Sequence, residues 1–430
     1  MSEELELRPI VLQEQCDAPV WLRAQDAALL QELGFEVHIA PPAPDTIAVD
    51  HCPDQNCFVV NPKQYVAHLE LSSGNILVVK PKIDPANVFR MLAYVYAGWN
   101  RDVFQHAEVL YSTDKFLFEP LVEIFCDLVA ARVRRGLVQD YMNHEENLTV
   151  LRGRILFESQ VAVNAMRPDR LFCRYQQQTL DTEDNQIVKW TLRYLTSFEG
   201  WSSHTVHSLR VNLRHFAEVS LRTPSRGALC ARVYNRMNDD YRLLHDFCRL
   251  FLDNRAITEH AGVWQFRGFL LDMNLLFEAF VTTAFSATAR STVFTVYSQR
   301  EDFLSHPPSI PIRIRPDVTV YEGTRTAAIV DAKYKRLNGP AGNPDFYQML
   351  AYGTALQCGC AYLIYPVTEW EGDTIVEVRH SPIKIHVRRI DIGHPNCVSL
   401  AEQVARTVLD ESSVLLPGPP PATGLTAGVA

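Results

Sequence analysis

Short apolar runs separated by turn-forming residues dominate the first part of the chain. Four such runs stand at residues 36–40, 45–50, 57–60 and 75–83, with Pro, Asp, Asn and Gly between them. Runs of this length bounded by these residue types are typical of β-strands. We therefore predict a β-rich N-terminal domain over residues 1–90.

The period of the apolar positions changes to that of α-helices over residues 91–262. Apolar residues recur every three or four positions in the segments 116–137, 185–198 and 238–252. The segment 148–163 (LTVLRGRILFESQVAV) alternates instead and predicts a hairpin or strand pair. The middle region is therefore expected to be mainly helical.

A helix, three strands, a second helix and a further strand are predicted between residues 263 and 400. The first helix, at 268–289, is apolar and contains a single interior acid, Glu278. The second helix begins near Asp345 and leads into the apolar run 360–366. This order predicts an α/β domain with a mixed central sheet, and a multidomain α+β or α/β protein as a whole.

Composition limits the functions that the chain as a whole can have. The 430 residues include 41 basic and 50 acidic ones, and the net charge of −9 gives no global signal of nucleic-acid binding. The segment 204–236 is the exception, because it combines six arginines with only one acid, Glu218. It is either a solvated surface or a surface that contacts phosphate groups or an acidic partner. The arginines are Arg210, Arg214, Arg222, Arg226, Arg232 and Arg236.

The sequence also indicates where the protein resides. It has no signal peptide and no run of apolar residues long enough to span a membrane, and its ten cysteines are irregularly spaced, so we expect a cytoplasmic protein with free thiols. Cys52 and Cys57, next to His51, are a weak candidate for zinc, and buried or loop thiols are the simpler interpretation. No Walker A motif is present, so nucleotide binding is not expected. The tail at 416–430, rich in Pro, Gly and Ala, is expected to be disordered.

Two aspartates stand in apolar runs on either side of a turn, in the stretch RPDVTVYEGTRTAAIVDAKYKR. Strand alternation places Lys333 on the same face as Asp331, and a hairpin would bring Asp317 to the same sheet edge. Neighbouring carboxylates repel unless a cation lies between them, and hard oxygen ligands suit Mg²⁺ or Mn²⁺. The backbone carbonyl of Ala332 could be a further ligand. A lysine beside the metal favours metal-assisted phosphodiester hydrolysis.

The simpler interpretation of Asp331 and Lys333 is an exposed ion pair at a strand end. Other residues favour a reactive site. Asp317 follows a proline, and Glu278, alone in its apolar helix, could reach the metal. Gln348 and Tyr352 share one face of the helix that follows, where they could contact a nucleic-acid backbone or the edge of the site.

These residues together resemble the signature of the PD-(D/E)xK nuclease superfamily, in its RecB-like form. The matching residues are Pro316-Asp317, Asp331-Ala332-Lys333, Gln348 and Tyr352. The resemblance implies that Asp317 and Asp331 are metal ligands, that Lys333 is the catalytic lysine, and that Glu278 is an accessory acid.

A longer series over residues 75–370 resembles the McrC family, the endonuclease subunits of McrBC modification-dependent (5-methylcytosine) restriction systems. The segments that carry this resemblance are KPKIDPANVFRMLAYVYAG, LRGRILF, LDTEDNQIVKWTL, YNRMNDDYRLLHDFCRLFL and DMNLLFEAFV. The resemblance implies a McrB-like AAA+ GTPase hexamer as the partner, bound and stimulated through the N-terminal part of the chain. It also implies DNA as the substrate and recognition of the modified base by the partner.

Two other functions stay open. The chain could be a non-catalytic adaptor that activates an AAA+ motor and carries a decayed nuclease domain, or it could be a RecB-like repair exonuclease. The complete set of two acids and one lysine argues against decay. The additional N-terminal and helical regions argue against a free-standing nuclease.

Overall fold

The structure is a computed structural model that describes most of the chain. The described residues are 9–39, 55–96, 118–198, 200–225, 227, 229, 231–236, 238–260, 263–305, 309–335, 343–367 and 373–414. They form two compact units, one within residues 1–80 and 105–271 and the other within 81–104 and 272–430. The domain boundaries expected from the sequence stay a prediction, because compactness alone does not show which segments fold independently.

Two sheets make up the β-rich part of the first unit. The larger has the order β1-β6-β5-β11-β10, with β1 parallel to β6, and the smaller is antiparallel with the order β2-β4-β3 and contacts helix α1. The strands and helix are β1 (Ile10–Gln13), β2 (Ala18–Arg23), α1 (Ala24–Glu32), β3 (Glu36–Ile39), β4 (Gln55–Asn61), β5 (Tyr65–Glu70), β6 (Ile76–Lys80), β10 (Arg255–His260) and β11 (Val263–Asp272). Three of the strands predicted here are present, and the one at 45–50 lies outside the described residues.

The larger sheet therefore includes β10 and β11, which are distant in sequence from its other strands. Gly268 in β11 has a φ of +124°, and a Cβ atom there would lie 2.1 Å from the carbonyl oxygen of His68 in β5. Only glycine permits so close an approach of the two backbones at a positive φ. Leu22, Val60 and Leu69 belong to the buried apolar core beneath these strands.

Four helices of the first unit pack against one another. They are α4 (Glu119–Arg135), α6 (Glu183–Thr196), α7 (Ser203–Arg214) and α9 (Tyr241–Asp253). Helix α6 contacts α7 and α9, and α4 contacts the same two helices. Buried Glu119 of α4 joins two of them, because its carboxylate accepts hydrogen bonds from Ser202 N at 3.0 Å and Thr205 Oγ1 at 2.7 Å at the start of α7.

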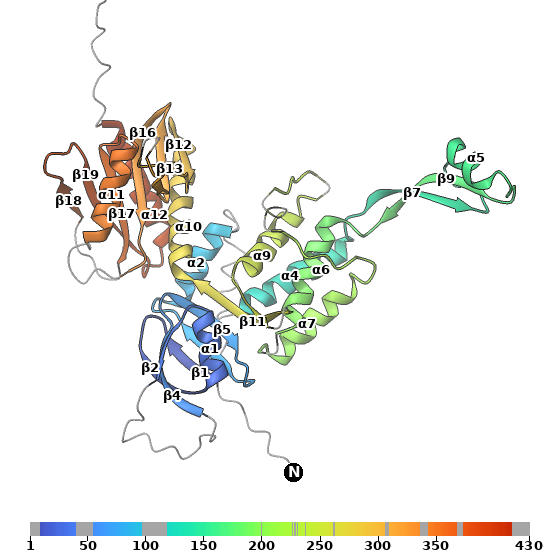
Figure 1. The fold of residues 1–430 in the computed structure, drawn as a ribbon, viewed down its shortest axis with the longest axis horizontal. Coiled ribbons are helices and arrows are strands. Elements are labelled where there is room, and N and C mark those ends of the chain that lie inside the picture. Colours follow the sequence, from blue (N-terminus) through green and yellow to red (C-terminus); the bar gives the residue numbers. More distant parts are fainter. Residues whose placement is uncertain are drawn as a thin grey trace, which may run out of the picture. The chain divides into compact units, whose positions relative to one another are not determined.

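A narrow arm extends from these helices (Figure 1). It consists of β7 (Asp140–Leu148), β8 (Arg154–Ile155), α5 (Phe157–Asn164) and β9 (Leu171–Thr179), joined in a sheet of order β7-β9-β8. The prediction of a hairpin or strand pair over 148–163 is therefore wrong: β8 pairs with β9 rather than with β7, and the second half of the segment is helix α5. The alternating pattern there also fits a helix, in which Gln160 and Asn164 lie one turn apart and both hydrogen-bond the carbonyl of Arg170.

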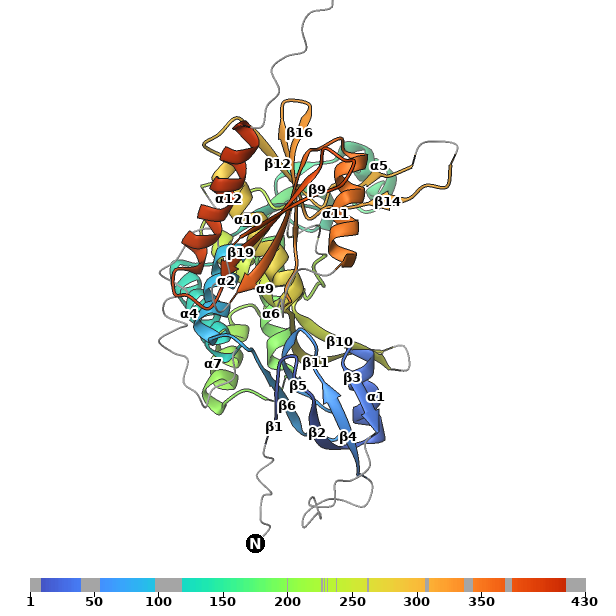
Figure 2. The ribbon, with the colours of Figure 1, turned by 90° about the vertical axis from the view of Figure 1, so that its left-hand side faces the viewer.

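A six-stranded mixed sheet is the centre of the second unit. Its order is β12-β15-β16-β17-β19-β18, with β16, β17 and β19 parallel and the other neighbouring pairs antiparallel. Helices α10 and α12 lie on one face and α11 on the other (Figure 2). The elements are α2 (Pro85–Tyr96), α10 (Met273–Ala289), β12 (Phe294–Ser298), β13 (Asp302–Phe303), β14 (Arg313–Ile314), β15 (Val318–Glu322), β16 (Arg325–Ala332), α11 (Asn343–Ala355), β17 (Cys360–Val367), β18 (Thr374–Glu377), β19 (Lys384–Asp391) and α12 (Cys397–Val414).

This mixed α/β architecture agrees with the predicted class. Helix α12, which packs against α10, α2 and β19, was not predicted, and the tail at 416–430 lies outside the described residues. None of the described helices is long and apolar enough to cross a membrane. Cys57 is buried in β4 and has a free thiol, whereas Cys52 lies outside the described residues, so the zinc interpretation stays open.

Candidate functional site

The two aspartates singled out from the sequence lie side by side at the end of a strand pair. Val318, which follows Asp317, pairs with Val330, which precedes Asp331. The side chain of Asp317 then reaches across to β16, where its Oδ2 accepts a hydrogen bond of 2.8 Å from Ala332 N. Asp331 is only 1% exposed.

A proline causes the position of Asp317. The sequence predicts one strand through residues 311–323, but β14 ends at Ile314 and β15 begins at Val318. Pro316 has no N–H to donate to a strand partner and restricts the residue before it, so the ladder is interrupted. Asp317 is thereby held at the start of a strand, beside the end of β16.

Lys333 completes the cluster at the end of β16. Its Nζ lies 2.6 Å from Asp331 Oδ2, and its backbone N donates to Ile364 O of β17 at 2.8 Å. Lys335, two residues further along the chain, pairs with Asp345 of α11 at 2.5 Å. Asp345 also accepts a hydrogen bond of 2.6 Å from Tyr365 OH, and its charge acts on Asp331 and Lys333.

The electrostatics of the cluster oppose two ionised carboxylates. Burial, then the charges of Asp331 and Glu278, raise the pKa of Asp317 to about 8, although Ala332 N–H and Lys333 act against the shift. Burial also raises the pKa of Asp331, against the opposing effect of Lys333. For Lys333, burial acts to lower the pKa, but the two aspartates outweigh it and raise the pKa. The cluster therefore favours a bound cation.

Glu278 of α10 is linked to this cluster through Gln299, a residue that we did not single out from the sequence. Gln299 has a φ of +47°, and its backbone N donates to Asp317 O at 2.9 Å. Its side-chain amide donates to Glu278 Oε1 and accepts from Arg315 Nη2 at 2.5 Å. Non-glycine residues in the left-handed region are uncommon, and strained backbones cluster at functional sites.

Gln348 and Tyr352, the two residues of α11 that were predicted to share a face, continue the same chain of hydrogen bonds. Gln348 Nε2 donates to Tyr352 OH at 2.6 Å, and this hydroxyl lies 3.4 Å from Arg315 O, to which it donates. Burial raises the pKa of Tyr352, and the charges of Asp331 and Asp317 raise it further. Glu278, Gln299, Arg315, Tyr352 and Gln348 thus form one chain around Asp317.

The residues present fit a hard divalent cation. Among the described residues, no group of three or more His, Cys, Asp or Glu side chains is arranged as a ready metal cage. Two adjacent aspartates are nevertheless the oxygen donors that suit Mg²⁺, which keeps several water ligands and seldom takes a cage made only of protein groups. The contact observed for Ala332 is through its N–H, so the role of its carbonyl stays a prediction.

Fold and site together define a multi-sheet α/β protein with a buried carboxylate–lysine cluster on a mixed sheet. The sequence model of the family described as "McrBC 5-methylcytosine restriction system component" matches residues 60–366. This match spans more than half of the 430 residues, and the chain therefore belongs to that family. No curated relative matches the sequence.

Two solved structures are similar to the chain. One is a refined half-complex from a tetradecameric assembly of Thermococcus gammatolerans McrB AAA+ hexamers with bound McrC, with a TM-score of 0.61 and 14% identity over 93% of this chain and 100% of that one. At this identity the likeness concerns the fold alone. The other is the Thermococcus gammatolerans McrBC complex, with a TM-score of 0.46 and 16% identity over 65% of this chain and 88% of that one.

Proposed function

We propose that the chain is the DNA-cleaving subunit of a McrBC-type restriction system, a Mg²⁺-dependent endodeoxyribonuclease. The observation that carries the proposal is the meeting of Asp317, Asp331 and Lys333 at the end of the β15–β16 pair. Membership of the restriction-system family supports it independently. The arrangement fits the PD-(D/E)xK nuclease signature that the sequence resembles.

In this proposal Asp317 and Asp331 hold the metal, with Glu278 and the Ala332 carbonyl as further ligands. The metal, when bound, supplies Lewis-acid stabilisation of the phosphoryl oxygens and an acidified water. Lys333, held 2.6 Å from Asp331, has a raised pKa and stays protonated at neutral pH. Its ammonium group therefore orients the water and neutralises charge on the phosphorane, rather than removing a proton.

The accessory residues position the acids. Gln299 fixes one oxygen of Glu278 and the backbone oxygen of Asp317 at once. Tyr352, oriented by Gln348, holds the carbonyl of Arg315 at the strand break. These contacts keep the loop that carries Asp317 in one conformation, which a metal site needs.

We propose an AAA+ GTPase hexamer as the partner, because the structure with a TM-score of 0.61 is described as McrB AAA+ hexamers with bound McrC. The family resemblance implies that the N-terminal domain, residues 1–90, binds this partner. The arm adds a second candidate surface, since several of its large apolar side chains lie in solvent, and exposed apolar patches mark interaction sites. These side chains are Tyr141, Met142, Val150, Leu151, Phe157, Val161, Val163 and Met166.

Cleavage of plasmid DNA by the reconstituted complex with GTP and Mg²⁺ tests the proposal. We expect Asp317→Asn, Asp331→Asn and Lys333→Ala each to abolish cleavage while partner binding survives. If all three variants still cut DNA, the site is assigned wrongly. If the unaltered chain stimulates the GTPase but never cuts, the adaptor function is correct. Degradation from DNA ends alone would identify the repair exonuclease.

A further inference from the structure

A groove with four basic side chains lies between α6 and α7 of the first unit. Its volume is about 630 Å³, and we refer to it as the α6–α7 groove. The residues that line it are Lys189, Arg193, Thr196, Arg210, Leu213, Arg214, Ala217 and Leu221. Among the residues that the structure describes, no acid lines the groove, although acids outnumber bases in the chain as a whole.

Three of these cations have no acidic partner within the described part of the chain. Arg193, Arg210 and Arg214 are exposed and form no ion pair with any residue in the described part of the chain. Lys189 donates a hydrogen bond to the carbonyl of Val219. Lys189 and Arg193 are four residues apart on α6, as are Arg210 and Arg214 on α7. Like charges at this spacing destabilise a helix, so this arrangement gives up some stability.

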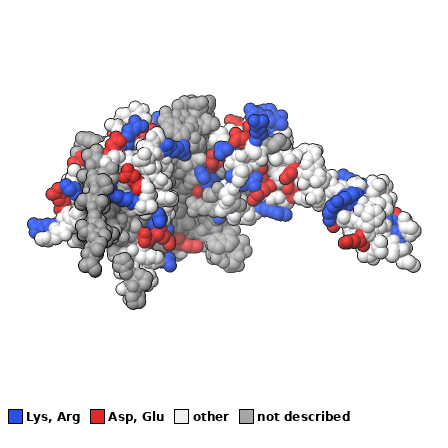
Figure 3. Space-filling model, turned by 90° about the horizontal axis from the view of Figure 1, so that it is seen from above, with Lys and Arg blue, Asp and Glu red and all other residues white. Residues whose placement is uncertain are grey.

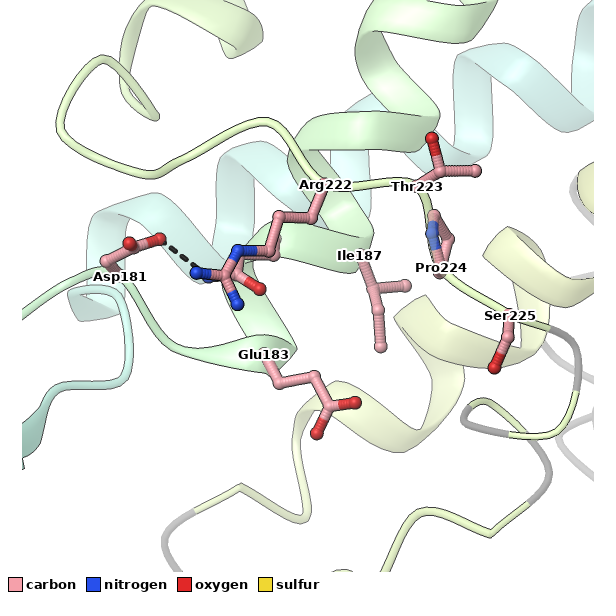
Figure 4. Close-up of a pocket in the computed structure, with 8 residues that line it drawn as sticks. Asp181, Glu183, Ile187, Arg222, Thr223, Pro224 and Ser225 are labelled. Carbon is pink, nitrogen blue, oxygen red and sulfur yellow. Dashed lines mark hydrogen bonds between the residues drawn. The ribbon is translucent and has the colours of Figure 1, made fainter.

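A neighbouring pocket of about 490 Å³ shows the usual local balance of charge (Figure 4). Asp181 there accepts hydrogen bonds from Gln186 and Ser220, and these bonds together with the charge of Arg222 lower its pKa despite burial. Basic and acidic side chains are likewise interspersed over the described surface seen in Figure 3. The unbalanced charge of the α6–α7 groove therefore differs from its surroundings.

We propose that the α6–α7 groove binds the sugar–phosphate backbone of duplex DNA. Arginine guanidinium groups bind phosphate oxygens in bidentate fashion, and two rows of cations match the repeating charge of a DNA strand. An acidic protein segment would need separate acids placed opposite each cation. Because the net charge of −9 repels DNA elsewhere, a local basic surface is required to hold it. The inference rests on the proposed function in taking DNA as the substrate.

The test measures binding of the full chain to a short, unmodified DNA duplex by fluorescence anisotropy. The buffer contains EDTA, so that no cleavage occurs, and the salt concentration is varied. The test variant changes Arg193, Arg210 and Arg214 to Gln. The plot of log K against log salt has a negative slope, and each lost phosphate contact reduces the magnitude of that slope by about 0.9. For the test variant we therefore expect a slope whose magnitude is smaller by about 2 to 3, and DNA binding weaker by at least about tenfold. Changing the same three residues to Lys should restore most of the slope.

A charge-matched variant controls for net charge. Arg134, Arg379 and Arg406 are also exposed and form no ion pair with described residues, and their change to Gln should leave the slope nearly unaltered. Equal losses in both variants, or no loss in the groove variant, would refute the groove as a DNA site. Weaker binding of the AAA+ partner with unchanged DNA binding would instead assign the groove to an acidic protein surface.

The two proposals can fail separately. If the unaltered chain cuts DNA and the groove variant binds DNA normally, the nuclease function stands and the groove proposal is wrong. If even the unaltered chain does not cut DNA, but the salt dependence of its DNA binding depends on the groove arginines, the groove proposal is correct and the catalytic assignment is wrong.

Discussion

At the scale of single residues, the chemistry of the site depends on a carboxyl group that the fold keeps from ionising. Burial, Asp331 and Glu278 raise the pKa of Asp317 to about 8. A bound cation would reverse the effect of the two neighbouring charges and release the proton. Perturbed carboxyl groups of this kind are more frequent at functional sites than at structural ones.

This pKa predicts how the stability of the metal-free protein depends on pH. Between about pH 4 and pH 8 the native state keeps a proton on Asp317 that the unfolded state has lost, so the free energy of unfolding falls as pH rises, by up to about 1.4 kcal/mol per pH unit. We expect Asp317→Asn to remove this dependence and to raise the melting temperature at pH 8. Thermal unfolding in EDTA from pH 5 to pH 8 checks this, and a parallel pH profile of variant and parent would contradict it.

Gln299 is expected to act on metal binding rather than on stability. Loss of its amide in Gln299→Ala frees Glu278 and Arg315, and should raise the Mg²⁺ concentration for half-maximal cleavage by about tenfold, in the range found for residues that orient metal ligands. The maximal rate at saturating Mg²⁺ should change less. Cleavage rates measured over a Mg²⁺ titration distinguish the two effects.

Gln299→Gly separates the amide from the backbone conformation. Glycine adopts a φ of +47° without strain, so this variant should be at least as stable as the parent yet share the weakened Mg²⁺ dependence. Normal Mg²⁺ dependence in Gln299→Gly would show that the side chain has no part in the site.

Which site residues can be predicted depends on how each is positioned. Asp331 and Lys333 follow from strand alternation, and Asp317 from its place across a short turn. Gln299 comes close to them because its own backbone adopts a left-handed conformation in a loop. Asp345 comes close because it belongs to α11, a helix that packs on the sheet. No spacing in the sequence encodes such contacts, because they depend on tertiary structure.

At the scale of elements, a buried asparagine secures the base of the arm. Asn185 Nδ2 donates to Val138 O at 2.8 Å, just before β7, and to Leu180 O at 2.7 Å, just after β9. Its Oδ1 accepts a hydrogen bond from Tyr241 OH of α9. One fully buried side chain therefore joins both strands of the arm to the helices.

We expect Asn185→Ala to destabilise the first unit by about 2–4 kcal/mol, because it removes three hydrogen bonds at once and leaves the buried hydroxyl of Tyr241 without its acceptor. Asn143→Ala is the control, since Asn143 lies exposed on β7 and makes no hydrogen bond with described residues through its side chain. Urea unfolding of both variants gives the difference, and equal stabilities would show that Asn185 does not secure the arm.

Periodicity predicted most elements but not all of their boundaries. It identified α6, α10 and β16, whose apolar patterns are long or strongly regular. It did not separate a strand from a helix in the short segment that became α5. It also could not show the break at Pro316, where the apolar pattern continues although the hydrogen-bond ladder stops.

At the scale of the whole molecule, the pairing of distant segments is what the sequence could not reveal. Strands β10 and β11 join the sheet of β1, β5 and β6, and α2 packs with α10 and α12. Both pairings connect segments separated by well over a hundred residues. Apolar periodicity reports which face of an element is buried, but not against what. The mixed α/β class was therefore predictable, whereas the sheet composition was not.

The proposed division of labour between site and arm predicts two separable losses. Asp331→Asn should abolish DNA cleavage and leave GTPase stimulation of the AAA+ partner intact, because in the proposal Asp331 binds the metal and has no contact with the partner. Changing Phe157, Val161 and Met166 to Ser should weaken partner binding and GTPase stimulation by at least about tenfold, because these side chains are 76%, 70% and 92% exposed and would bury apolar surface only in the complex.

The arm variant should melt near the temperature of the parent, since its altered side chains are already in solvent. Size-exclusion chromatography with the partner, GTP hydrolysis and plasmid cleavage measure the three properties on the same samples. If the arm variant binds and stimulates the partner normally, partner docking belongs to residues 1–90 or to another surface. If the Asp331 variant loses GTPase stimulation together with cleavage, the two functions are not separable in this chain.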